Sequence, residues 1–222
     1  MKVVKFLFLI VFALFFVLPS PAQISQTTET SLSYGLVVDN SNSLRPIMKR
    51  LKQACKNIVA GNKADDETFI VRFSSSEKIE QASNFTQDIS ALNKTIDKFD
   101  AELGQTAIID ALYLSAQYLS QKSRISQMNR RKALVLITDG EDRDSYYKMD
   151  QVLELLKKEK IAVYVISLSY ELKEASGKEA FQKATEFINT VTKETGGNAF
   201  LVKKKEQIEE TVGGVLDKIR QP

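Results

Sequence analysis

Short apolar runs alternate with longer stretches of helical periodicity along most of this chain, and this alternation limits the folds open to it. Leu134–Ile137 and Ala162–Ile166 are apolar throughout and do not alternate with polar residues. Strands buried on both faces have this composition, which is typical of parallel sheets covered by helices. The chain is therefore predicted to be an α/β protein with a doubly wound, mostly parallel six-stranded sheet and helices on both faces.

The element boundaries follow from apolar periodicity and from glycine stops such as Gly61 and Gly196-Gly197. The predicted strands are Leu32–Val38, Thr68–Phe73, Ala133–Thr138, Ile161–Leu168 and Ala199–Val202, with a short edge strand at Lys78–Ala82. The predicted helices are Pro46–Ala60, Asp88–Phe99, Ala107–Gln121, Met149–Lys160, Lys178–Thr195 and Glu206–Ile219.

Residues 1–22 have the pattern of a cleaved signal peptide. Lys2 and Lys5 form a basic start, Phe6 to Leu18 is unbroken apolar, and Ser20-Pro21-Ala22 supplies the small residues of a cleavage site. As a helix the apolar stretch rises only about 20 Å, short of a bilayer core of about 30 Å. An uncleaved membrane anchor is the alternative. The signal predicts a secreted or periplasmic protein, with no membrane attachment after cleavage.

Residues 23–33 are polar and are predicted to form a linker, which leaves residues 34–220 as one domain. The whole chain has a formal net charge of +3. Cleavage after Ala22 would remove two lysines and no acids, so the mature chain would carry +1. A nearly neutral chain offers no long-range attraction for nucleic acid or anionic membrane, and neither is expected as a partner.

The absence of histidine excludes several kinds of site, among them the Ser-His-Asp triad, the Cys-His pair and histidine-bound zinc. The single cysteine, Cys55, excludes an internal disulfide. Cys55 falls at helical spacing with Leu51 and Ile58, so it is expected to be a core residue. Pairing with another chain is the alternative.

Oxygen-bearing side chains follow the first predicted strand at alternate positions: Asp39, Ser41 and Ser43. Downstream, Thr106 opens a predicted helix, and Asp139 ends another buried strand. Parallel sheets of this type bind ligands beyond the carboxyl ends of their strands. These five side chains could therefore meet at one edge of the sheet, where carboxylate and hydroxyl oxygens suit Mg²⁺, Mn²⁺ or Ca²⁺.

The order Asp39-x-Ser41-x-Ser43, then Thr106, then Asp139 resembles the metal ion-dependent adhesion site of the von Willebrand factor type A domain. This family has a Rossmann-like fold, also called the integrin I-domain fold, and the resemblance covers about residues 34–220. It implies that Ser41 and Ser43 ligate the metal directly. Thr106 would bind directly or through water, and Asp39 and Asp139 mainly through bridging waters.

The resemblance also implies the kind of partner, a protein that presents a carboxylate. Neutral hydroxyl ligands leave the cation underneutralised, and Mg²⁺ can exchange one of its waters for a carboxylate from outside. The chain departs from the family pattern at Asn42 and Gln105, where many relatives have glycine. Neither position supplies a ligand, so the departures concern the shape of the loops and access to the site.

Three interpretations of function are open. An exported metal-dependent binding or adhesion module is favoured, and a scaffold with a vestigial metal site is the second. The third, a Mg²⁺-dependent hydrolase, is disfavoured because Ser41 stands where phosphoryl-transfer folds of this kind carry a second carboxylate, and no phosphate-binding loop is present. The protein is expected not to be an enzyme.

Two further segments leave alternatives open. Glu141, Asp142 and Asp144 could bind a second cation, or could form a solvated loop in which Arg143 offsets the charge. Gly213-Gly214 lies inside the last predicted helix, Glu206–Ile219, where each glycine costs about 1 kcal/mol. Either that helix is easily displaced and switches partner affinity, or the glycines allow close packing.

Overall fold

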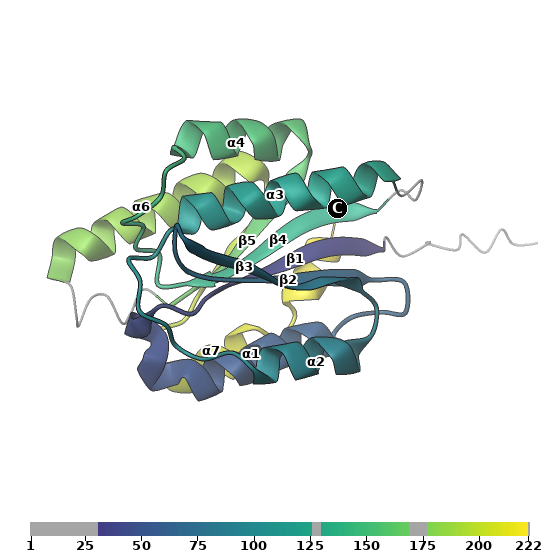
Figure 1. Cartoon of the computed structure of the whole chain (residues 1–222), viewed down its shortest axis with the longest axis horizontal. Helices are drawn as coiled ribbons and strands as arrows, with labels where there is room; N and C mark the ends of the chain where they lie inside the picture. The colour runs from purple at the N-terminus through teal and green to yellow at the C-terminus, as the bar shows by residue number, and fades with distance from the viewer. Residues whose placement is uncertain (1–30, 126–129, 169–176, 222) are drawn as a thin grey trace, which may run out of the picture.

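The computed structural model describes residues 31–125, 130–168 and 177–221. The predicted signal peptide, residues 1–22, lies outside the described residues. The fold is a six-stranded sheet with helices on both faces, as the sequence predicted (Figure 1). The strand order is β3-β2-β1-β4-β5-β6, and only the β2–β3 pair is antiparallel.

The strands and the helices follow one another along the chain in the predicted order. The strands are β1 (Leu32–Asp39), β2 (Glu67–Ser75), β3 (Lys78–Thr86), β4 (Arg131–Thr138), β5 (Ile161–Ser167) and β6 (Ala199–Leu201). The α-helices are α1 (Met48–Ala60), α2 (Ile89–Asp97), α3 (Ile108–Ile125), α4 (Met149–Lys158), α6 (Gly177–Thr195), α7 (Ile208–Thr211) and α8 (Val215–Arg220). Two short 3₁₀ helices are η1 (Asn42–Ile47) and η2 (Lys205–Gln207).

The sheet separates two apolar layers. Helices α3, α4 and α6 cover one face, and α1, α2 and α7 cover the other (Figure 1). Consecutive residues of the central strands enter opposite layers, so β1 and β4 are buried on both faces. Cys55 is fully buried in the α1 layer, as its helical spacing predicted, and burial raises the pKa of its thiol to about 12.

The position of the site follows from the way the chain winds. From β1 it crosses through α1 to β2 on one side, and later through α3 to β4 on the other side of β1. The direction of winding therefore changes between β1 and β4, and loops at their carboxyl ends diverge and leave room for a ligand. Asp39 is the last residue of β1, and Asp139 directly follows β4.

The edge strand β3 is longer than predicted. β3 runs from Lys78 to Thr86 rather than ending at Ala82, and register shifts interrupt its pairing with β2. Such bulges twist an edge strand away from further pairing. The first strand begins at Leu32 as predicted, so Leu32 and Ser33, which the predicted linker also included, are buried residues of β1.

The prediction of one continuous last helix, Glu206–Ile219, is wrong. The segment forms η2, the single-turn α7 and then α8, with Gly213-Gly214 between the last two. Gly214 adopts a left-handed conformation, with φ of 81°. A helix of L-residues cannot continue through that conformation, which glycine adopts readily. A Cβ at Gly214 would meet no atom within 4 Å, so close packing does not explain this glycine either.

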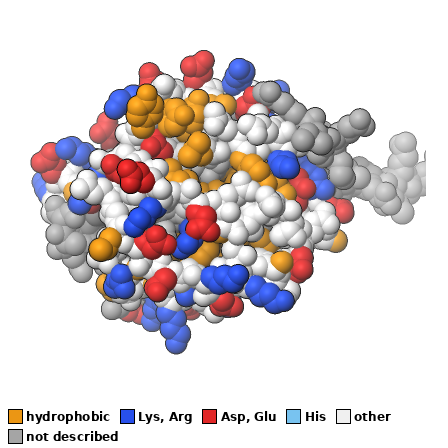
Figure 2. Space-filling model, viewed as in Figure 1, with side chains coloured by type: hydrophobic (Ala, Val, Ile, Leu, Met, Phe, Trp, Pro, Cys, Tyr) orange, Lys and Arg blue, Asp and Glu red, His pale blue; other side chains and the backbone are white. Residues whose placement is uncertain are grey.

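The surface is mixed in charge, in keeping with a nearly neutral domain. Figure 2 shows acidic and basic side chains interspersed over the face in view, with hydrophobic side chains between them. Within the described ranges, no helix combines the length and apolar character needed to cross a membrane.

Candidate functional site

Asp39 anchors the site between the two central strands. Its side chain is completely buried. Oδ1 accepts a hydrogen bond from the backbone N–H of Ser41 at 2.9 Å, and Oδ2 accepts one from the hydroxyl of Thr138 at 2.8 Å. The first bond shapes the turn that leaves β1, and the second ties that turn to the end of β4. The carboxylate is therefore held in one orientation.

Two serine hydroxyls connect this turn to Asp139. The Oγ atoms of Ser41 and Ser43 lie 3.1 Å apart, and the Ser43 hydroxyl donates to Asp139 Oδ2 at 2.9 Å. A hydroxyl has one proton to donate, so in this arrangement Ser41 is the donor to Ser43. Asp139 Oδ1 also accepts the backbone N–H of Glu141 at 3.1 Å. Four of the five predicted residues thus gather at the carboxyl ends of β1 and β4.

Thr106 lies on a neighbouring segment that is fixed by its backbone. Glu102 N–H donates to the carbonyl of Asn40 at 2.8 Å, which sets this segment alongside the Ser41 turn. The carbonyl of Thr106 accepts the N–H groups of Arg143 and Asp144. Thr106 is buried, yet among the described residues its hydroxyl makes no hydrogen bond to the other four.

Gly104 explains how the Thr106 segment comes so close to β2. A Cβ at this position would lie 2.1 Å from the carbonyl oxygen of Ser74, much closer than any real contact. The backbone can therefore pass here only without a side chain. The physical role of this glycine is therefore close approach to β2.

The two aspartates are buried carboxylates placed near each other. Burial, followed by repulsion from Asp139, raises the pKa of Asp39 to about 7. Burial is also the main cause that raises the pKa of Asp139, while its bonds from Glu141 and Ser43 and the charge of Arg143 oppose the shift. Hydroxyls and backbone N–H groups orient this pair, and none of them neutralises its charge.

The acidic loop after β4 is used by the fold. Asp142 Oδ1 accepts the backbone N–H of Ile108 at 2.7 Å, so it caps the start of α3 from a distant part of the chain. Asp144 Oδ2 accepts both the N–H and the hydroxyl of Ser76. Glu141 forms an ion pair with Arg143 at 2.6 Å, the charge offset that the sequence suggested. Each of the three carboxylates has a partner, which disfavours a second cation.

The capping role of Asp142 was missed because its partner lies 34 residues earlier in the sequence. Ordinary capping residues stand directly before their helix and can be recognised there. Asp110, in the first turn of α3, completes the arrangement by accepting the N–H groups of Tyr146 and Tyr147. The loop after β4 and the start of α3 therefore hold each other in place beside Thr106.

A family model described as the von Willebrand factor type A domain matches residues 35–213. The chain belongs to this family. The match covers most of the described domain, including all five predicted site residues. Von Willebrand factor type A (VWA) domains are generally protein-interaction modules.

Curated relatives include the collagen alpha-6(VI) chains of Homo sapiens and Mus musculus. Each is 30% identical over 151 residues, which is 64% of this chain but 6% of the collagen. The chain therefore spans a small part of the curated relatives it matches.

Solved structures match over most of the chain. One is an aerotolerance-related membrane protein from Bacteroides fragilis, with a TM-score of 0.62, 18% identity, and coverage of 85% of this chain and 98% of that one. Another is a von Willebrand factor type A protein from Catenulispora acidiphila, with a TM-score of 0.63, 13% identity, and coverage of 82% and 41%. At these identities the likeness concerns the fold alone.

The donor set decides what kind of cation the site could hold. Among the described residues, no three Asp, Glu, Cys or His side chains gather as a metal cluster. Coordination by Asp39 and Asp139 would therefore depend on the hydroxyls of Ser41, Ser43 and Thr106. Hard oxygen donors of this kind suit Mg²⁺, Mn²⁺ or Ca²⁺ rather than a thiolate- or imidazole-seeking metal.

Proposed function

We propose that this VWA domain is an exported binding module in which a divalent cation recruits an acidic residue of a partner protein. The observation that carries the proposal is the bonded series Ser41, Ser43 and Asp139 beside the buried Asp39. Its members are oxygen donors at the carboxyl edge of the sheet, where Ser43 is exposed, and two are carboxylates without an ion-pair partner among the described residues. A cation would offset both the burial and the mutual repulsion of these groups.

In this proposal the side chains have distinct tasks. Ser41 and Ser43 offer neutral oxygens, and Thr106 offers a third from the adjacent segment. Asp39 and Asp139 supply negative charge and, through their present hydrogen bonds, hold the serine turn in place. The bound cation would supply an open position that accepts a carboxylate from outside. Mg²⁺ is the preferred candidate, with Mn²⁺ and Ca²⁺ as alternatives.

We further propose that the module binds and does not catalyse a reaction. The chain has no histidine, and in this proposal the carboxylates that accept the hydroxyls of Ser43 and Thr138 serve the cation, so no general base remains to activate a nucleophile. Activity of the Mg²⁺-loaded protein in a phosphatase or esterase screen would contradict this part of the proposal.

The export part of the proposal rests on the pattern of residues 1–22 and on the relatives. One relative is a collagen chain and one is described as a membrane protein, which loosely suggests an extracellular or envelope location. Cleavage after Ala22 would give a mature N-terminus of Gln23-Ile24-Ser25. N-terminal sequencing of the native protein tests this directly, and an intact Met1 in a membrane fraction would exclude it.

Titration calorimetry and thermal melting test the metal site. The protein should bind one divalent cation, and at a concentration of 100 times Kd the cation should stabilise the fold by about 2.7 kcal/mol. Asp139→Ala should abolish most of the binding while the domain stays folded, because the site lies at an edge of the sheet. Asp65→Ala, which removes an exposed carboxylate near the start of β2, is the matched control and should bind normally.

The same preparations test the partner. Proteins captured from the source organism's envelope fraction in Mg²⁺ should be released when the metal is removed, and Asp139→Ala should capture none of them. Absence of Mg²⁺, Mn²⁺ and Ca²⁺ binding, with melting unchanged by metal, would overturn the metal-dependent function and favour a scaffold with a vestigial site.

A further inference from the structure

A cavity with a basic lining lies at the end of the sheet opposite to the proposed metal site. It has a volume of about 660 Å³ and opens between the starts of β4 and β5, the turn before β6 and the end of α8. Arg131, at its edge, begins β4, whereas Asp139 follows the same strand. A strand of this length spans roughly 25 Å, so the cavity and the metal site are separate places.

Four cationic side chains line this cavity: Arg131, Lys132, Lys160 and Lys218. Among the described residues that line it, none carries a carboxylate. Tyr164 and Ala162 add apolar surface, and Tyr164 lies close enough to Arg131 for that charge to act against the burial that raises the tyrosine pKa.

Within the described part of the chain, Arg131, Lys160 and Lys218 form no ion pair. Lys132 pairs with Glu159 at 3.8 Å, a carboxylate outside the cavity lining. Arg131 donates to the backbone carbonyls of Ile219 and Gln221, which carry no net charge. Lys218 donates to the side-chain amide of Gln221 at 3.0 Å. The contacts of Arg131 and Lys218 orient these two cations and leave their charge available to a ligand.

Lys160 adds a second observation, from the backbone. It is the only non-glycine residue with positive φ among those described, at 54°. The position follows the end of α4, where glycine or asparagine is usual because other L-residues are strained in the left-handed conformation. The chain thus keeps a lysine in an unfavourable conformation at a place where its side chain lines the cavity.

We propose that this cavity, the basic pocket, binds a small molecule carrying two or more phosphate groups. The clustered cations suit several anionic oxygens at once, because charge-assisted hydrogen bonds to phosphate are stronger than neutral ones. The apolar surface of Ala162 and Tyr164 suits the compact body that joins the phosphates. The volume fits a ligand of that size and is in the range of small-molecule sites.

A structural role for the same cations makes a different prediction. α4 and α6 both end beside the pocket, and cations stabilise helix C-terminal ends. If that were their sole role, removing the Lys160 charge would lower stability and affect no ligand. Lys160→Asn separates the two, because asparagine tolerates the left-handed conformation and carries no charge. The variant should be at least as stable as the wild type yet bind polyphosphate poorly.

The experiment is calorimetry of the full chain with sodium tripolyphosphate, inorganic pyrophosphate and ATP. The buffer is made metal-free with a chelating resin, because soluble chelators are themselves polyanions. Wild type should bind with a stoichiometry of one and lose affinity as salt is raised. Lys160→Asn should weaken binding about tenfold or more. Lys49→Gln, an equal charge change on the exposed face of α1, should leave binding unchanged, as should Asp139→Ala.

Three results would overturn the proposal: no binding of any of these probes at millimolar concentration, equal binding by Lys160→Asn and wild type, or equal weakening by Lys49→Gln. A final arm uses vesicles containing phosphatidylglycerol. Binding to these vesicles without binding to soluble polyphosphates would also overturn it, since the ligand would then be a membrane surface and not a small molecule.

Discussion

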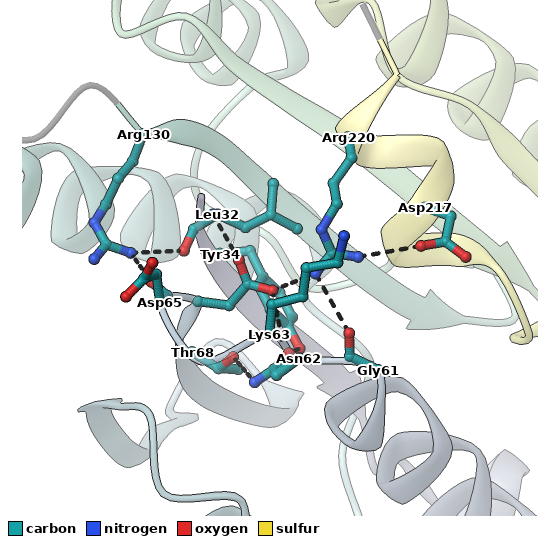
Figure 3. A network of polar contacts seen from close by, with 11 residues as sticks. Leu32, Tyr34, Gly61, Asn62, Lys63, Asp65, Thr68, Arg130, Asp217 and Arg220 are labelled. Carbon is teal, nitrogen blue, oxygen red and sulfur yellow. Dashed lines mark hydrogen bonds and ion pairs between the residues drawn. The ribbon is translucent and has the colours of Figure 1, made fainter. Parts of the chain in front are cut away.

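The two ends of the sheet each contain a buried aspartate, and the fold treats them differently. Asp66, near the amino ends of the strands, accepts the N–H groups of Leu32 and Lys63 and forms an ion pair with Arg220. Figure 3 shows the surrounding network, in which Arg220 also contacts Asp217 and the carbonyl of Gly61. Asp39, at the carboxyl end, has a second aspartate beside it and no ion-pair partner among the described residues.

This difference indicates what each aspartate does. A buried carboxylate that receives a cation from its own chain has its charge compensated by folding, and its role is structural. A buried carboxylate that lacks such a partner and lies beside another one has a raised pKa and gains from a cation brought from outside. The same residue type at similar burial therefore serves the fold at one end and, in our proposal, a ligand at the other.

The largest expected effect comes from removing the cation that serves Asp66. Arg220→Ala should reduce the free energy of unfolding by about 3 kcal/mol, because it leaves a buried charge unpaired. Urea denaturation measures this loss. Arg220→Lys should restore part of it, and Asp217→Asn, which removes the exposed partner of the same arginine, should change little. A loss below about 1 kcal/mol for Arg220→Ala would show that the pair is not structural.

The next effect tests Asp39 through pH. Its folded pKa of about 7 lies above the ordinary value of 3.8. The folded state thus keeps a proton that the unfolded state has lost, so this group's contribution to stability declines as pH rises from about 4 to about 7. Asp39→Asn lacks that decline. In metal-free urea denaturation, its stability relative to wild type should improve by more than about 1 kcal/mol between pH 5 and pH 7.5.

Metal provides the control for that experiment. Saturating Mg²⁺ should recover much of the stability that wild type loses at pH 7.5 and should leave Asp39→Asn nearly unchanged. If the stabilities of wild type and Asp39→Asn without metal changed with pH in parallel, Asp39 would not carry an uncompensated charge and would not differ from Asp66 in this respect.

A smaller effect concerns Gly213-Gly214, which precedes α8, the helix that ends at Arg220. Gly214→Ala should destabilise the domain by about 1 kcal/mol, because alanine is strained at positive φ. Gly213→Ala should stay within about 0.5 kcal/mol, since this glycine does not have positive φ. Thermal melting of the two single variants distinguishes them. If Gly214→Ala instead stabilised the domain, the result would support the continuous last helix that the sequence predicted.

The smallest effect concerns an exposed ion pair, and it tests whether an ion pair stabilises the fold without being buried. Glu179 and Lys183 form an i,i+4 pair on α6 at 2.9 Å, and both side chains are exposed. Glu179→Gln should cause no measurable change in the free energy of unfolding, because solvent screens the pair. A loss comparable to that of Arg220→Ala would mean that burial does not distinguish these contacts.

The sequence by itself determined the order and type of most elements and the residues of the candidate site. Apolar runs and helical periodicity are local patterns, so they located β1, β4 and β5 and most of the helices. Asp39, Ser41 and Ser43 share one turn, and Asp139 follows a buried strand; in a parallel sheet such positions meet at the carboxyl edge. Thr106 was included because it opens a predicted helix, and the family resemblance supplied the expected roles, which the metal experiments above are designed to test.

Only the tertiary structure decided which charges are compensated. Asp66 and Arg220 are 154 residues apart, and Asp142 caps a helix that begins 34 residues earlier. No local pattern contains such pairs, because they depend on how the strands register and where the chain returns. The break at Gly214 is similar, since periodicity continues through the glycines and the backbone turns at them. The spacing of residues in the sequence specifies which of them share a helix or strand. The tertiary packing specifies which helices, strands and loops supply one another's hydrogen-bond and ion-pair partners.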